Sequence, residues 1–188
     1  MDAIVEAALR KWPNVPHCHG WLALDARGDW YMRDERIQAA GPFPRVKGSR
    51  ITHDKLREFI HRNYACDGVG GWFFQNGPQR VYVELEAAPW VWRVDDAGEA
   101  AAGTGGGRWR VSSHTGLPAI QRGAWLDENG RLFLDTDLGF GLVHTLDMDV
   151  AAAAVEAGAW QPVEMPFAAM PAHFGYCLKP AAEVRETG

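Results

Sequence analysis

Residues 72–94 read WFFQNGPQRVYVELEAAPWVWRV, and this stretch decides the fold. From Arg80 to Glu86 apolar residues alternate with polar ones, which is the period of two expected for a strand with one buried face. Residues 90–94 alternate in the same way. Asn76-Gly77-Pro78 supplies a turn, because glycine accepts a positive φ and proline has no N–H to continue a ladder. The stretch therefore predicts three β-segments joined by two tight connections.

Hairpins and helices are expected on both sides of this stretch. They are a helix over residues 3–12, a hairpin with strands Gly20–Asp25 and Asp29–Asp34, a helix from Thr52, a strand at Trp109–Ser113, a second hairpin with strands Ile120–Leu126 and Arg131–Asp135, and a helix over residues 148–157. Each hairpin loop begins with aspartate and ends with glycine, which suits a type I turn followed by a left-handed residue. Such short loops make the joined strands antiparallel.

Two halves of the chain share this order of elements. The loop 25–28 matches the loop 127–130, and each hairpin is followed by a helix, a tryptophan (Trp72 or Trp160) and a glutamate shortly before a proline and an aromatic residue. The competing explanation is coincidence, since glycine turns and proline–aromatic pairs are common. An internal repeat would decide the fold.

The sequence therefore predicts an α+β protein of two similar halves, each a small twisted antiparallel β-sheet with one helix packed on it. The expected halves are residues 1–95 and 108–180. The glycine-rich residues 96–107 connect them within one compact unit.

The composition narrows the class of partner. Hydrophobic residues make up 47% of the 188 residues, which is enough for a core without disulfides. A net charge of −5 and the lack of a basic run argue against nucleic-acid binding, which needs a positive stripe. No apolar run is long enough to span a bilayer, so no membrane partner is expected. No motif for a cofactor is present, and the sequence leaves the oligomeric state open.

The compartment is predicted from the cysteines and the N-terminus. Cys18, Cys66 and Cys177 are odd in number and far apart, which favours reduced thiols over a disulfide framework. The N-terminal residues carry acids early and do not resemble a signal peptide. We therefore expect a cytoplasmic protein.

His17 and His19 are the candidate metal ligands. In an extended segment the two side chains point to the same side, as two ligands of one ion must. A metal needs further ligands, and His173 and Cys177 are possible donors that no spacing joins to this pair. The competing interpretation is a polar strand entry held by backbone hydrogen bonds, because zinc sites normally show paired donors in both halves.

A candidate ligand-binding surface follows from the polar face of the central strand. Its residues are Gln75, Asn76, Arg80, Tyr82 and Glu84. They combine a planar cation, an aromatic ring and amide groups, which suits an anionic or peptide-like ligand, or a protein partner, better than a lipid. We expect this site at the seam between the halves, since ligand sites are concave. The competing interpretation is a solvent-facing set of cross-strand ion pairs.

Two family resemblances cover parts of the chain. The segments 28–30, 56–59, 83–90 and 132–136 resemble an uncharacterised bacterial family built from two repeats of a small α/β motif, and that resemblance implies a signalling or regulatory role. Trp90 stands where that family tends to have phenylalanine. The segments PNVPHCHGW at 13–21 and WFFQNGPQRVYV at 72–83 instead resemble a separate uncharacterised proteobacterial family. Neither resemblance implies catalytic residues.

Two functions are consistent with these observations. The first is a non-catalytic binding or regulatory module. The second is a small metal-dependent hydrolase that uses His17 and His19 with nearby acids. The sequence contains no recognisable catalytic triad, phosphate loop or complete metal-ligand set, which favours the binding module.

Overall fold

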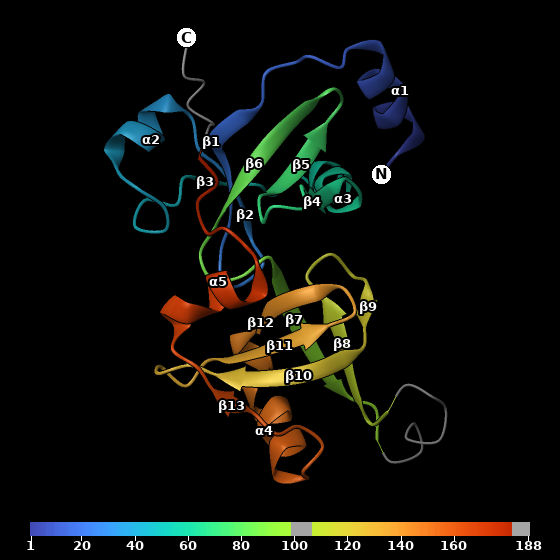
Figure 1. The fold of residues 1–188 in the computed structure, drawn as a ribbon, viewed down its shortest axis with the longest axis vertical. Helices are drawn as coiled ribbons and strands as arrows, with labels where there is room; N and C mark the ends of the chain where they lie inside the picture. Colours follow the sequence, from blue (N-terminus) through green and yellow to red (C-terminus); the bar gives the residue numbers. More distant parts are fainter. Residues whose placement is uncertain (99–106, 182–188) are drawn as a thin grey trace. The chain divides into compact units, whose positions relative to one another are not determined.

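The computed structural model describes residues 1–98 and 107–181 (Figure 1). The chain divides into two compact units. The first contains Met1–Asp25, Asp29–Glu86 and the residues from Gly175 onward, and the second contains Ala26–Gly28 and Ala87–Phe174. Each unit has its own sheet, and the helices are short, so the predicted α+β class is confirmed. No helix in the described ranges is long and apolar enough to cross a membrane.

The first unit is built on a six-stranded sheet with the order β3-β2-β1-β6-β5-β4. Its strands are β1 (Cys18–Leu24), β2 (Trp30–Met32), β3 (Ser49–Arg50), β4 (Tyr64–Cys66), β5 (Trp72–Asn76) and β6 (Gln79–Leu85). Its helices are α1 (Ala3–Lys11), α2 (Glu35–Ala40) and α3 (Asp54–Arg62). The helices predicted at residues 3–12 and from Thr52 are confirmed, although His53 rather than Thr52 caps α3 by accepting the Leu56 backbone N–H.

The second unit is built on a seven-stranded sheet with the order β13-β10-β11-β12-β7-β8-β9. Its strands are β7 (Trp90–Asp96), β8 (Trp109–Ser113), β9 (Pro118–Ala119), β10 (Gln121–Leu126), β11 (Leu132–Thr136), β12 (Gly139–Val143) and β13 (Val163–Glu164). Its helices are α4 (Met148–Glu156) and α5 (Met170–Phe174), with the 3-10 turns η2 (Thr145–Asp147) and η3 (Phe167–Ala169). The helix predicted over residues 148–157 is therefore confirmed as α4.

The two sheets have the same strand order. Adding six to every strand number in the first sheet gives β9-β8-β7-β12-β11-β10, which is the second sheet without β13. Each sheet contains two three-stranded meanders joined by a parallel pair, β1 with β6 or β7 with β12, and β13 adds a parallel edge strand to the second sheet. The sheets are therefore mixed and not purely antiparallel as predicted. Hairpin loops fix only the pairs inside a meander, and the sequence gives no signal for the pair that joins two meanders.

A shared hairpin loop corrects the predicted alignment of the repeat. Asp67 and Asp127 each accept, through Oδ1, the backbone N–H groups two and four residues further along, at 2.8–2.9 Å. These loops join β4 to β5 and β10 to β11, which are equivalent strands in the two sheets. The predicted alignment of Asp127 with Asp25 is therefore wrong. Asp25 also accepts the N–H four residues further along, so the strand order, and not the loop itself, identifies Asp67 as the equivalent of Asp127.

The boundary between the units differs from the predicted halves 1–95 and 108–180. β7 pairs with β8 and β12, so the stretch 72–94 contributes strands to both sheets, and the units separate between Glu86 and Ala87. The alternation that predicts β6 and β7 carries no information on which sheet each strand joins. The predicted connector 96–107 links β7 to β8 along the chain, and these two strands are antiparallel neighbours in one sheet. Residues 99–106 lie outside the described residues.

Trp92 is central to the core of the second unit. Its side chain is fully buried, and its indole Nε1 donates a hydrogen bond of 3.1 Å to the Leu134 carbonyl. The ring stacks against Trp90, with 5.8 Å between the centroids. Gly141 makes room for it, since a Cβ at that position would lie 2.4 Å from the indole nitrogen. The Trp92 ring thus has both the space that it needs, at Gly141, and an acceptor for its buried N–H, the Leu134 carbonyl.

The first prediction concerns this core. Trp92→Ala should lower the free energy of unfolding by about 3–5 kcal/mol, because it removes a large buried ring and leaves the Leu134 carbonyl without its donor. Urea denaturation followed by circular dichroism measures the loss. Trp12→Ala is the control, since about half of that side chain is exposed, and we expect a change within about 0.5 kcal/mol. A loss below about 1 kcal/mol for Trp92→Ala would contradict the prediction.

Candidate ligand-binding site

A bulge in β1 shapes the candidate site. Cys18 pairs with Val81 and Leu22 pairs with Val83, so β1 advances four residues while β6 advances two. Gly20 lies inside this irregular stretch with a φ of 79°, and a Cβ there would lie 2.8 Å from the Gln38 Oε1. The position therefore requires glycine. Bulges redirect side chains and are frequent beside functional sites.

Two histidine rings contact one tyrosine of β6: His19 lies in β1, and His17 directly precedes this strand. The His19 ring stacks on Tyr82, with 4.6 Å between the centroids and 9° between the planes. The His17 ring meets the same tyrosine edge-on at 5.8 Å. His17 and His19, the predicted pair, thus have Tyr82 as a common neighbour. The contact made by both rings is aromatic, and the pair encloses Tyr82 from two directions.

Asp67 fixes the Tyr82 ring from the other end. The Tyr82 hydroxyl donates to Oδ2 of Asp67 at 3.1 Å, while Oδ1 of the same carboxylate accepts two backbone N–H groups of its own hairpin loop. Gly71 closes that loop, and a Cβ on it would lie 2.4 Å from Asp67 Oδ2 and 2.8 Å from Tyr82 Cε1. The Asp67 carboxylate therefore has its acceptor positions largely occupied by structural bonds.

Arg80 brings a positive charge to the same face of β6. Its guanidinium lies over the Phe73 ring, 4.5 Å from the centroid, which positions the side chain by a cation–π contact. Among the described residues, no carboxylate forms an ion pair with Arg80. The charge is therefore held in place without a neutralising partner.

These side chains line a cavity of about 860 Å³. Its lining combines two prolines that follow α1, the loop between β4 and β5, and residues of the C-terminal segment. The residues with polar side chains are Asn14, His17, His19, Asp67, Arg80, Tyr82 and Cys177. All the lining residues belong to the first unit. A concave site that combines aromatic walls with convergent polar groups is typical of small-ligand binding.

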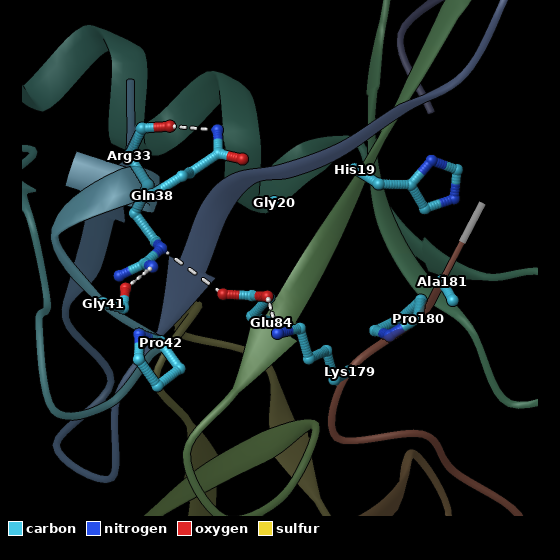
Figure 2. A pocket seen from close by; sticks show the side chains of 10 residues that line it. All are labelled: His19, Gly20, Arg33, Gln38, Gly41, Pro42, Glu84, Lys179, Pro180 and Ala181. Carbon is cyan, nitrogen blue, oxygen red and sulfur yellow. Dashed lines mark hydrogen bonds and ion pairs between the residues drawn. The ribbon is translucent and has the colours of Figure 1, made fainter. Parts of the chain in front are cut away.

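A second cavity of about 280 Å³ adjoins the first, and Figure 2 shows its lining. Glu84 from β6 and Arg33 from the end of β2 meet there as a buried ion pair, with 3.3 Å between Arg33 Nε and Glu84 Oε2. Lys179 of the C-terminal segment approaches the other oxygen of Glu84 at 3.6 Å. His19, Pro180 and Ala181 line both cavities.

The protonation states follow from burial and neighbours. Burial, and secondly the nearby His17, lower the pKa of His19, so its imidazole is neutral at pH 7. Burial raises the pKa of Tyr82, and the hydrogen bond to Asp67 adds to this rise against the opposing effect of Arg80, so the hydroxyl stays protonated and donates. The charged groups facing the larger cavity are therefore Arg80 and the occupied carboxylate of Asp67.

The predicted site residues separate into three groups. Arg80 and Tyr82 line the larger cavity together with His17 and His19, and Glu84 lines the smaller one. Gln75 is buried, and its amide donates to the Gly77 carbonyl at 2.9 Å, while Asn76 is exposed at the end of β5. Neither amide residue lines either cavity.

Three charged residues of the site were not predicted. They are Asp67, Arg33 and Lys179, which reach it from a loop, from just after β2 and from beyond the second unit. Only Asp67 had a sequence signal, the Asp-x-x-Gly loop. Contacts made over the longest sequence separations leave no local pattern to find.

The metal interpretation finds no complete ligand set. Cys177 lines the same cavity as His17 and His19, whereas His173 lies in α5 of the second unit. Over residues 1–98 and 107–181, no group of three histidine, cysteine or carboxylate side chains is arranged to hold an ion. A zinc site needs at least three protein ligands.

Comparison with known proteins places the chain among families without an assigned function. A family model described as "Protein of unknown function (DUF2946)" matches residues 1–181. Among solved structures, a DUF1285 family protein from Silicibacter pomeroyi DSS-3 is similar, with a TM-score of 0.50 and 14% sequence identity over 80% of this chain and 83% of that chain. At this identity the likeness concerns the fold alone. The curated proteins contain no match. The expectation of an uncharacterised family is thus confirmed, and the resemblance to a two-repeat signalling family is not supported.

The second prediction separates the ring of Tyr82 from its hydroxyl. Tyr82→Ala should cost about 3–4 kcal/mol of stability, because the ring is buried and contacts His17, His19 and Phe73. Tyr82→Phe should cost only about 1 kcal/mol, since it removes one hydrogen bond, to a carboxylate that keeps its backbone donors. Chemical denaturation measures both, and Lys55→Ala, at an exposed position of α3, is the control. Equal losses for the two tyrosine variants would contradict this division.

Proposed function

This chain belongs to the DUF2946 family of proteins of unknown function, and we propose that it is a non-catalytic binding module whose first unit takes up a small anionic ligand. The observation that carries the proposal is Arg80, a positioned guanidinium without an ion-pair partner among the described residues, at a cavity of about 860 Å³. A guanidinium binds carboxylate or phosphate oxygens in pairs, and low local hydration strengthens the contact. A regulatory role would rest on this binding.

The remaining lining supports recognition of a ligand with a flat or apolar body. The stacked rings of His19 and Tyr82 form part of the wall, and both rings are uncharged at pH 7. Aromatic walls contribute contact area and favour planar groups. Val15, Pro16 and Val69 add apolar surface around the rings. The ligand we expect therefore carries one anionic group for Arg80 and a body that packs against rings.

The arrangement favours binding over catalysis. Asp67 would be the nearest candidate for a general base, yet its oxygens accept the Tyr82 hydroxyl and two backbone N–H groups. Tyr82 donates its proton to that carboxylate, and the face of His19 lies against the tyrosine ring. These three polar groups are thus held in structural contacts, whereas general acid–base catalysis needs a group within reach of a substrate proton.

The third prediction tests the role of Arg80. Succinate and inorganic phosphate should shift the NMR signals of the His19 ring in a saturable manner, and raised salt should weaken the binding. Arg80→Ala should weaken succinate binding about 10- to 100-fold, the range for losing hydrogen bonds to a charged group. Arg122→Ala is the matched control, since this exposed arginine lies on β10 of the second unit. Equal affinity in the Arg80 variant would overturn the proposal.

The metal-dependent alternative has its own readout. Elemental analysis of protein purified without chelators would detect stoichiometric zinc or iron, and His17→Ala would then reduce the metal content. Such a result would favour the hydrolase over the binding module. Binding of succinate at Arg80 in metal-free protein would favour the binding module.

A further inference from the structure

Glu84 is a buried carboxylate that lacks hydrogen-bond donors. Its side chain is 8% exposed, and its Oε2 has no hydrogen-bond partner within the described ranges. Arg33 Nε lies 3.3 Å away without the alignment of a hydrogen bond, and the other two guanidinium nitrogens donate to the carbonyls of Val46 and Gly41. A carboxylate has about four acceptor positions, and leaving them unmet inside a protein is unfavourable.

The chain's own Lys179 shows which group this position accepts. Its ammonium lies 3.6 Å from Glu84 Oε1, which is beyond hydrogen-bond distance, and its side chain is 69% exposed (Figure 2). An ion pair this open contributes little to stability. A second ammonium group could therefore replace Lys179 at Glu84 without changing the local charge, and it could approach closely enough to donate hydrogen bonds.

Glu84 and Arg80 lie on one face of one strand. Residues 80, 82 and 84 alternate along β6, so their side chains point to the same side. At a rise of about 3.3 Å per residue, the Cα positions of the two residues are roughly 13 Å apart along the strand. The charged groups are closer than this, because the Arg80 guanidinium lies over Phe73, which pairs with Tyr82. The two cavities that they line share His19, Pro180 and Ala181. A positive and a negative recognition group therefore stand at the two ends of adjoining cavities, with Tyr82 between them.

We propose that the ligand is a short peptide with free termini, whose carboxylate binds Arg80 and whose ammonium replaces Lys179 at Glu84. This inference rests on the proposed function, because it assigns the anionic group at Arg80 to a peptide C-terminus. An extended peptide advances about 3.3–3.6 Å per residue, so about four residues are the upper limit for a peptide that bridges the two groups. A single amino acid carries its two charges on neighbouring atoms and cannot reach both groups.

Ligand variants test this without altering the protein. Calorimetry should show that trialanine binds about 10- to 100-fold more tightly than N-acetyl-trialanine, which lacks the ammonium, or trialanine amide, which lacks the carboxylate. If N-acetyl-trialanine binds as well as trialanine, the peptide proposal is overturned while the anion site at Arg80 stands. If none of the peptides bind but succinate does, the same conclusion follows. If succinate also fails to bind, the proposed function itself is overturned.

The Lys179 variant gives the second, independent readout. Lys179→Ala should tighten trialanine binding about two- to fivefold, because it removes a competing ammonium, and should leave N-acetyl-trialanine binding unchanged. Lys55→Ala is the control, since this exposed lysine lies in α3. A purely structural role for Lys179 predicts unchanged or weaker binding instead, and either outcome would overturn the proposal. Glu84→Gln is less suitable, because it would leave the buried Arg33 without its counter-charge.

Discussion

The parallel pairing of β1 with β6 is the contact on which the first unit depends. It joins two meanders into one sheet, and it places His19 of β1 against Tyr82 of β6. The pairing is not regular, since β1 contains extra residues around Gly20. A regular parallel pair would keep neighbouring side chains in step along both strands. The irregular one turns His19 onto the tyrosine ring, and His19 then lines both cavities.

In both sheets the hairpin loops are stabilised locally, by side chains that accept backbone N–H groups of the loop. Each hairpin with an aspartate loop closes itself, because one carboxylate oxygen accepts the N–H groups that the turn would otherwise leave unpaired. Ser113 plays the same part between β8 and β9, where its hydroxyl accepts the N–H groups of Thr115 and Leu117. Local loops thus determine the meanders, and long-range parallel pairing combines the meanders into sheets.

Sequence patterns predicted the parts of the fold that are local. The alternation in 79–85, the helices α1, α3 and α4, and the hairpin loops all lie close to where they were expected. The competing interpretation of this strand, a solvent-facing set of cross-strand ion pairs, does not fit Tyr82 and Glu84, because both residues are buried. Residues 13–19 and 175–181 cover that face, and they reach it from opposite ends of the chain. The alternation tells which residues share a face, but contacts of such long range decide whether that face meets water.

The two units use the same central pair in opposite ways. In the second unit the register of β7 with β12 is continuous. The indole of Trp92, together with the Cβ and backbone carbonyl of Trp90, fills the space that Gly141 leaves open, where no Cβ would fit. In the first unit the bulged pair carries small rings and charged groups, and cavities lie beside it. Close packing of large rings stabilises a sheet but leaves no room for a ligand. The first unit is therefore the better candidate for a ligand site. Its equivalent pair, β1 with β6, is interrupted by the bulge, and the cavities beside it are lined by Arg80 and Glu84.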